Sequence, residues 1–137
     1  MKAAQIVFDE GIGVPILLGD KEAILELKEE IGFDAEVMII DPKTNEEKER
    51  RERFANQYWE KSNRKGITLH EAKKWMRERN YFAAMMVNNG EADGMISGYS
   101  RSYPTVVKPM LELVGMATGV TRIATTNLMI TDRGPMF

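Results

Sequence analysis

The chain contains no cysteine and a single histidine among its 137 residues. The absence of cysteine excludes disulfides, zinc–thiolate sites and cysteine nucleophiles. With His70 as the one histidine, a histidine-based metal centre or a His-dependent triad is not expected from this chain alone. We therefore expect no catalytic residue and no metal ligand within it.

Long hydrophobic runs and a strong net charge are also absent. No apolar stretch approaches the roughly 20 residues that span a bilayer, and the N-terminus lacks the pattern of a secretory signal. The formal net charge of −2 gives no general attraction to nucleic acid or anionic membranes. We therefore expect a cytoplasmic protein without nucleic-acid or membrane partners. Its 43% hydrophobic residues suit a single domain with a real core.

Strands and helices alternate in the first part of the chain. Apolar spacing predicts a helix over residues 1–10, a buried strand over 14–18 and a second strand over 37–40. Between these strands, Asp20 is placed to cap a helix that continues through Ile31. This alternation predicts an α/β fold with a parallel sheet covered by helices.

The middle of the chain predicts helices with different surroundings. Residues 43–53 are highly charged and continue into Phe54 and Tyr58, so we expect a solvated helix face. Its acidic and basic residues are spaced one turn apart and predict the pairs Glu46–Arg50, Glu47–Arg51 and Glu49–Arg53. Thr68 and Glu71 have the spacing of a capping box, and residues 81–87 are apolar nearly all round, which predicts a central buried helix.

The last third predicts a short strand over residues 95–97, a helix over 104–114 and a strand over 122–130. Pro109 lies inside the predicted helix, where it is tolerated only near the first turn or with a kink. No repeat or flexible linker is visible, so we expect no internal domain boundary. The chain ends soon after the last predicted strand, and we interpret it as part of a larger domain.

One segment carries candidate chemistry. Phosphate recognition requires small residues that permit close approach, hydroxyl and backbone donors, and fixed cations. These properties meet between residues 97 and 108, in Ser97, Gly98, Ser100, Arg101, Ser102, Thr105 and Lys108. Two interpretations remain open from the residues alone: a binding site for a phosphate-containing small molecule, or a capped helix start with an exposed arginine.

Several short blocks resemble the phosphate acetyl/butyryl transferase family. They are Asp41-Pro42-Lys43, Lys65-Gly66-Ile67-Thr68, Tyr81-Phe82-Ala83-Ala84-Met85-Met86, Gly90 to Gly98, and Thr105 to Pro109. Their order and spacing cover nearly the whole chain. The resemblance implies a three-layer αβα fold with a mostly parallel sheet, shared with isocitrate and isopropylmalate dehydrogenase-like proteins, here as a partial domain.

Finer blocks look similar to one branch of that family. Residues 86–90, 97–104 and 133–137 resemble the C-terminal phosphotransacetylase-like domain of bacterial hybrid malic enzymes. The resemblance implies an oxidoreductase parent that decarboxylates malate with NAD(P) and a divalent metal such as Mg or Mn. It implies that this domain binds acetyl-CoA or another acyl-CoA as an allosteric effector and supports homo-oligomer formation, without a cofactor of its own.

Departures from the family pattern leave a second possibility. Family members carry an arginine just before the helix proline, where this chain has Lys108, and lysine lacks the bidentate fork of arginine. The family's catalytic aspartate and serine–arginine pair belong to a later segment. We therefore expect the isolated chain to be inactive. The alternative is part of a stand-alone phosphate acetyltransferase, which moves acetyl between acetyl phosphate and CoA; a third possibility is a pure oligomerisation module.

Overall fold

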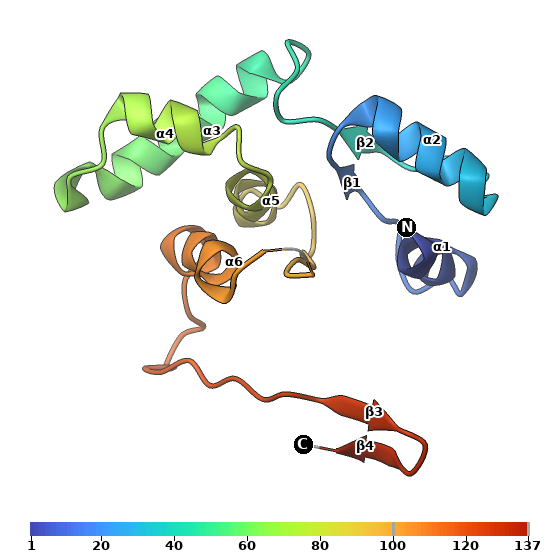
Figure 1. Cartoon of the computed structure of the whole chain (residues 1–137). Helices are drawn as coiled ribbons and strands as arrows, with labels where there is room; N and C mark the ends of the chain where they lie inside the picture. The colour runs from blue at the N-terminus through green and yellow to red at the C-terminus, as the bar shows by residue number, and fades with distance from the viewer. Residues whose placement is uncertain (100, 137) are drawn as a thin grey trace.

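The computed structural model of the chain describes residues 1–99 and 101–136, and it combines helices with two small sheets (Figure 1). In chain order the elements are α1 (Lys2–Asp9), β1 (Leu17–Leu18), α2 (Lys21–Ile31), β2 (Ile39–Ile40), α3 (Lys48–Ser62), the 3-10 turn η1 (Asn63–Lys65), α4 (Leu69–Trp75), α5 (Arg79–Asn88), α6 (Tyr103–Pro109), the π-helix η2 (Met110–Val114), β3 (Met129–Thr131) and β4 (Gly134–Met136). This content agrees with the predicted α/β class.

The N-terminal part confirms the predicted alternation of helices and strands. β1 and β2 pair in parallel, with Leu17 opposite Ile39, and α2 connects them (Figure 1). The Asp20 carboxylate accepts a hydrogen bond from the backbone N–H of Ala23 at 3.0 Å, which caps α2 as predicted. The first strand is shorter than expected because Val14 is 74% exposed and has no sheet partner.

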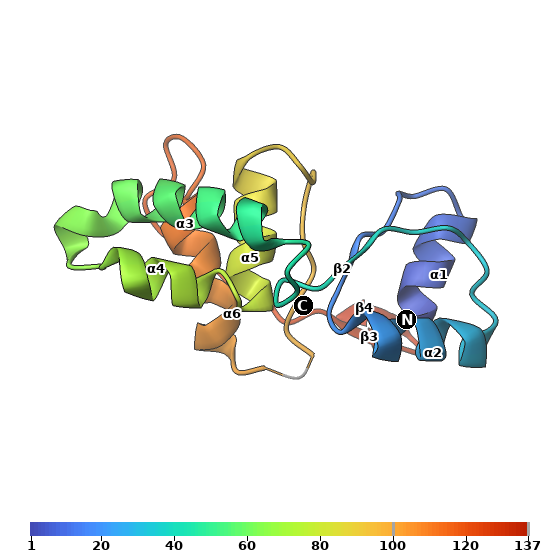
Figure 2. The ribbon, with the colours of Figure 1, turned by 90° about the horizontal axis from the view of Figure 1, so that it is seen from above.

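The core lies between α3, α4, α5 and η2, which we call the helical body. Phe54 of α3 and Phe82 of α5 are fully buried, with ring centroids 5.2 Å apart. Figure 2 shows α3 and α4 side by side, with α5 next to them. Six successive residues of α5, Tyr81 to Met86, are buried, which confirms the prediction of a central helix. Full burial of such large side chains contributes about 1.5–3 kcal/mol each.

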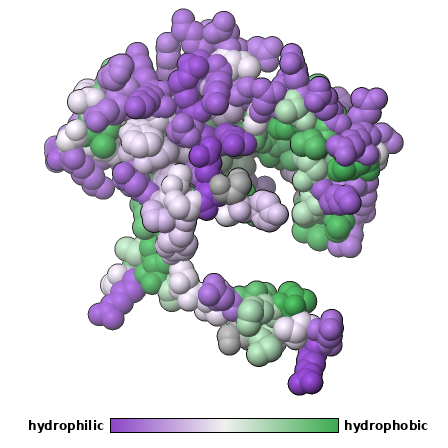
Figure 3. Space-filling view, viewed as in Figure 1, coloured by the Kyte–Doolittle hydropathy of each residue, from purple (hydrophilic) through white to green (hydrophobic). Residues whose placement is uncertain are grey.

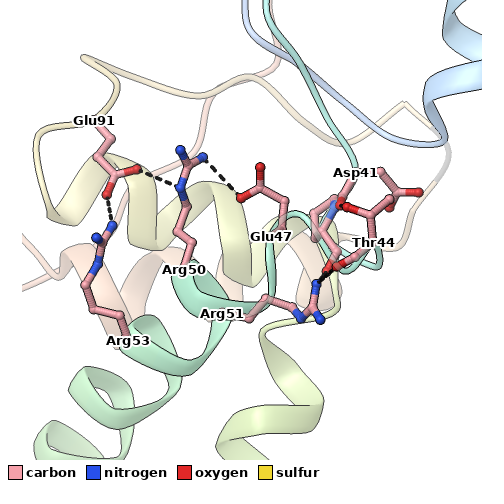
Figure 4. A network of polar contacts seen from close by, with 8 residues as sticks. Asp41, Thr44, Glu47, Arg50, Arg51, Arg53 and Glu91 are labelled. Carbon is pink, nitrogen blue, oxygen red and sulfur yellow. Dashed lines mark hydrogen bonds and ion pairs between the residues drawn. The ribbon is translucent and has the colours of Figure 1, made fainter.

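The charged face of α3 differs from the prediction. Among the described residues none of the three predicted i,i+4 pairs forms. Instead Glu91, in the turn after α5, accepts from Arg53 at 2.6 Å and lies 3.6 Å from Arg50, which also approaches Glu47 (Figure 4). A carboxylate from another element therefore replaces the expected partners within the helix.

Arg51 is the clearest exception to the expected solvated face. It lies on the same side of α3 as Phe54 and Tyr58 and is only 9% exposed. Its guanidinium donates to the backbone carbonyls of Pro42, at 2.7 Å, and of Thr44 (Figure 4). Burial is tolerated because these carbonyls satisfy the donors.

The helix predicted over residues 104–114 is split at Pro109. α6 ends at Pro109, and η2 follows immediately with π-helical geometry. Proline has no N–H to donate to the carbonyl four residues earlier, and its ring crowds that carbonyl. The change of helix type is the distortion that the position of Pro109 predicts.

Of the two strands predicted in the C-terminal part, the first does not form and the second is much shorter than predicted. Residues 94–98 form no strand, and Ile96 is fully exposed because no neighbouring strand covers it. Of the predicted strand over 122–130 only Met129 and Ile130 are regular; they belong to β3 (Met129–Thr131), which pairs antiparallel with β4 in a hairpin. The sheets are therefore one parallel and one antiparallel pair. Figure 3 shows the hairpin, with its hydrophobic residues, standing away from the bulk of the molecule.

Candidate functional site

Pro109 shapes the predicted site through the carbonyl that it leaves without a partner. That carbonyl belongs to Thr105, and the side-chain amide of Asn80 donates to it at 3.3 Å. The carbonyl oxygen of the Asn80 side chain accepts a hydrogen bond from the Ser97 hydroxyl at 2.7 Å. Asn80, which the sequence did not single out, lies 17 residues before Ser97 and 25 before Thr105, and it connects these two residues.

At the start of α6, Thr105 also contacts Ser102, another residue of the predicted site. The hydroxyls of Ser102 and Thr105 lie 2.8 Å apart and form a hydrogen bond. Gly98 has φ of 124°, a conformation that side chains disfavour, and a Cβ there would meet open space. Ser97, Gly98, Ser102 and Thr105 are all exposed and accessible to a ligand, whereas Ser100 lies outside the described residues.

Lys108 belongs to a different cluster. Its ammonium lies 5.6 Å from the centre of the Trp75 ring and 3.8 Å from one carboxylate oxygen of Glu112. No hydrogen bond joins it to Ser102 or Thr105 among the described residues. The predicted constellation is therefore divided, with the hydroxyls at the start of α6 and the amine one turn further along.

Glu112 is fixed by two buried tyrosines. Its second carboxylate oxygen accepts hydrogen bonds from the hydroxyls of Tyr58, at 2.9 Å, and Tyr81, at 3.0 Å. Burial raises the pKa of Tyr58 to about 12, with a further contribution from the hydrogen bond to Glu112, and the same two causes raise the pKa of Tyr81. Both tyrosines therefore remain donors at neutral pH, and the carboxylate that faces Lys108 is held in place.

Arg101 lies in a cleft that the sequence analysis did not predict as a site. The cleft has a volume of about 200 Å³, and nine residues line it: Gly19, Asp20, Asp41, Pro42, Lys43, Arg77, Glu78, Arg79 and Arg101. The first five follow the ends of β1 and β2. The signal was present in the sequence, because ligands of parallel sheets bind outside the carboxyl ends of the strands, and Gly19 and Asp41 directly follow the two predicted strands.

Residues 1–99 and 101–136 include no group of three or more His, Asp or Glu side chains arranged to hold a metal ion. In the same residues, no helix is both long and apolar enough to cross a membrane. His70 is exposed in the first turn of α4.

The whole chain, residues 1–137, matches the model of the phosphate acetyl/butaryl transferase family. The chain therefore belongs to this family. Its α/β architecture and the family blocks quoted above are consistent with this assignment.

The individual relatives are phosphate acetyltransferases. The chain is 35% identical over 130 residues to one from Thermoanaerobacterium thermosaccharolyticum, and 32% identical over 130 residues to one from Acetivibrio thermocellus. The two matches cover 94% and 95% of this chain and 38% of each relative. The chain therefore spans little more than a third of the length of these proteins.

Two solved structures share the fold. EutD phosphotransacetylase from Staphylococcus aureus matches with a TM-score of 0.74 at 30% identity, and a phosphotransacetylase from Streptococcus pyogenes with 0.73 at 35% identity. Each match covers 88% of this chain and 36% of the other.

These relatives correct the expectation of a malic enzyme. The named relatives are transferases, and none of them is an oxidoreductase that decarboxylates malate. The expectations of a parent that uses NAD(P) and a divalent metal, and of acetyl-CoA as an allosteric effector of such a parent, lose their basis with it. The short blocks at residues 86–90, 97–104 and 133–137 misled because they were too few to distinguish branches of one family.

Proposed function

We propose that this chain is part of a phosphate acetyltransferase, which transfers an acetyl group between acetyl phosphate and CoA. The observation that supports this proposal is the family match over residues 1–137, together with identities of 30–35% to proteins of that name. In the reaction the CoA thiolate attacks the carbonyl carbon of acetyl phosphate, the bond from that carbon to the phosphate oxygen breaks, and phosphate leaves with the electron pair.

Within this reaction we assign substrate binding to the segment between Ser97 and Lys108. Gly98 leaves room for the substrate, and the hydroxyls of Ser102 and Thr105 donate to phosphate oxygens. Lys108 supplies a positive charge for the phosphate that develops as the leaving group. The Glu112 carboxylate lies 3.8 Å from the Lys108 ammonium and holds it beside the Trp75 ring. The ammonium therefore has a defined position before the substrate binds.

Ser100 and Arg101 complete the segment in this proposal, with Arg101 directed to the more distant phosphates of an acyl-CoA. We propose that the whole protein has the three-layer αβα arrangement of isocitrate and isopropylmalate dehydrogenase-like proteins, and that this chain forms part of one domain of it. We also propose that it assembles as a homo-oligomer.

The test is an assay of the whole polypeptide that carries this chain, with acetyl phosphate and CoA and with thioester formation followed by absorbance. We expect transfer to depend on both substrates. Lys108→Ala is expected to lower kcat/KM by about 100-fold, since one charge-assisted contact in the transition state is lost. Lys108→Arg is the matched variant, which keeps the charge and is expected to retain most activity. Absence of thioester formation by the unaltered polypeptide would contradict the proposal.

A further inference from the structure

The cleft around Arg101 carries an unusual set of charges for a surface depression. Four cations line it, namely Lys43, Arg77, Arg79 and Arg101. Among the described residues none of these four side chains forms an ion pair or a hydrogen bond with another residue. Cations gathered in one concave site without partners favour an anion that is supplied from solution.

None of the three carboxylates of the cleft, Asp20, Asp41 and Glu78, forms an ion pair with these cations among the described residues, and two of them have other partners. Asp20 accepts from the backbone N–H of Ala23 at 3.0 Å and caps α2. Asp41 accepts from the backbone N–H of Lys43 at 2.9 Å, which fixes the turn after β2. Both acids therefore have a structural role that explains their presence beside the cations.

A further positive charge lies against the lining residue Pro42. Arg51 is buried and donates to the carbonyl of Pro42, which is itself a lining residue. Burial and the nearby charge of Arg77 lower the pKa of Arg51. Figure 4 shows Arg51 directed toward the turn that holds Asp41 and Thr44. The Arg51 side chain thus fixes the position of this turn without a bound ligand.

The ends of the two strands set the shape of the cleft. The backbone N–H of Gly19 donates to the carbonyl of Ile40 at 3.0 Å, which ties together the points where β1 and β2 end. A Cβ on Gly19 would lie 3.6 Å from the guanidinium of Arg79 and 3.1 Å from Ile24. The guanidinium of Arg79 therefore lies beside the strand ends, whereas the tight approach at Gly19 is to Ile24.

We propose that this cleft binds a ligand group with two adjacent phosphates, through Arg77, Arg79, Lys43 and Arg101. A volume of about 200 Å³ is smaller than the roughly 300–1,000 Å³ of sites that enclose a whole cofactor. The cleft therefore holds the phosphates and leaves the rest of the molecule outside. Arginine matches phosphate oxygens with two parallel hydrogen bonds, which a monatomic anion such as chloride cannot accept in the same way.

This cleft shares Arg101 with the segment assigned to acyl-CoA binding, but its other lining residues lie outside that segment. Anion binding in the cleft does not depend on the transfer reaction. The phosphates could belong to CoA or to a free polyphosphate or nucleotide. Both sources present the same chemistry to the cleft.

The test is calorimetric titration of the whole polypeptide that carries this chain with pyrophosphate at low ionic strength. We expect saturable binding with one site per chain. Arg77→Gln and Arg79→Gln are each expected to weaken binding about tenfold, and a rise in salt concentration should weaken it further. Arg122→Gln is the matched control, because it removes the same charge from an exposed position that does not line the cleft.

Absence of pyrophosphate binding by the unaltered chain would overturn the proposal, and so would an equal loss of affinity in the Arg122→Gln control. Arg77 and Arg79 are exposed, so both variants are expected to keep the thermal midpoint of the unaltered chain. Titration with CoA in the presence of saturating pyrophosphate then distinguishes the sources. Competition assigns the site to the phosphates of CoA, and independent binding assigns it to a separate polyphosphate or nucleotide. Since no step requires acetyl transfer, a protein inactive in that assay could still bind pyrophosphate here.

Discussion

The helical body and the C-terminal segment of residues 115–136 are both rich in apolar residues, yet they bury them very differently. In the body Phe54 and Phe82 have no exposed surface. In the C-terminal segment Leu128 is 55% and Ile130 is 77% exposed. Figure 1 shows the body as packed helices and the C-terminal segment as an extended, irregular stretch that ends in a hairpin.

The difference shows that hydrophobicity gives a core only where several elements supply it. α3, α4, α5 and η2 each bring an apolar face to the same volume, so every buried side chain has neighbours on several sides. β3 and β4 have only each other as regular partners, and an isolated two-stranded hairpin is marginally stable in water. Substitutions in the two regions should therefore have unequal effects.

The largest difference is expected between Phe82→Ala and Ile130→Ala. Phe82 is fully buried against Phe54, so its truncation leaves a cavity and should lower the free energy of unfolding by about 3–5 kcal/mol. Ile130 is mostly exposed, and its truncation should change that free energy by less than about 0.5 kcal/mol. Urea denaturation of both variants measures the contrast. Equal losses would mean that the C-terminal segment packs as firmly as the body.

A second comparison uses two neighbouring arginines of α3. Arg51→Met removes a buried donor and leaves the carbonyls of Pro42 and Thr44 without their partner, which should cost about 3 kcal/mol. Arg53→Met removes an arginine whose side chain is 56% exposed and whose pair with Glu91 lies at the surface, so less than about 1 kcal/mol is expected. Denaturation again measures both, and similar losses would show that burial of Arg51 contributes nothing.

The same contrast explains how far the sequence could predict the fold. The Asp20 cap, the Thr68–Glu71 box and the buried helix at residues 81–87 were predictable, because each depends on residues within a few positions of one another. The burial of Arg51 and the pairing of Arg53 with Glu91 were not, because they depend on contacts between separate elements. The strand predicted at residues 95–97 failed for the same reason, since a strand requires a neighbour that its own sequence does not specify.

The candidate site was predictable to a similar extent. The small and hydroxyl residues between Ser97 and Thr105 form a local pattern, and the structure brings Ser97 and Thr105 to a common partner. That partner, Asn80, carried no signal because a single asparagine at a helix start has no motif. Arg77 and Arg79 likewise resemble ordinary surface arginines until the strand ends are placed beside them.

The hydrogen bond from Tyr58 to Glu112 inside the helical body should make the free energy of unfolding depend on pH in the alkaline range. The folded-state pKa of Tyr58 is raised from 10.0 to about 12, so its contribution is fully present below pH 10 and is lost as the pH rises toward 12. The free energy of unfolding should fall across this range, and Tyr58→Phe should reduce the fall by about 2 kcal/mol. Denaturation at several pH values between 9 and about 12 tests this expectation. Tyr99→Phe is the control, because that side chain is fully exposed; an unchanged fall in Tyr58→Phe would contradict the expectation.

The smallest of these effects is expected at the start of α4, on the edge of the body. The Thr68 hydroxyl accepts from the backbone N–H of Glu71 at 3.2 Å, and the Glu71 carboxylate accepts from the backbone N–H of Thr68 at 2.9 Å. Thr68→Ala removes the side-chain half of this box and should lower the free energy of unfolding by about 1 kcal/mol. Thr68→Ser keeps the hydroxyl and should restore most of the loss. Because α4 packs on α3 in the body, the loss should appear in the same cooperative transition as that of Phe82→Ala. A separate, earlier transition in Thr68→Ala would instead show that α4 unfolds independently of the core.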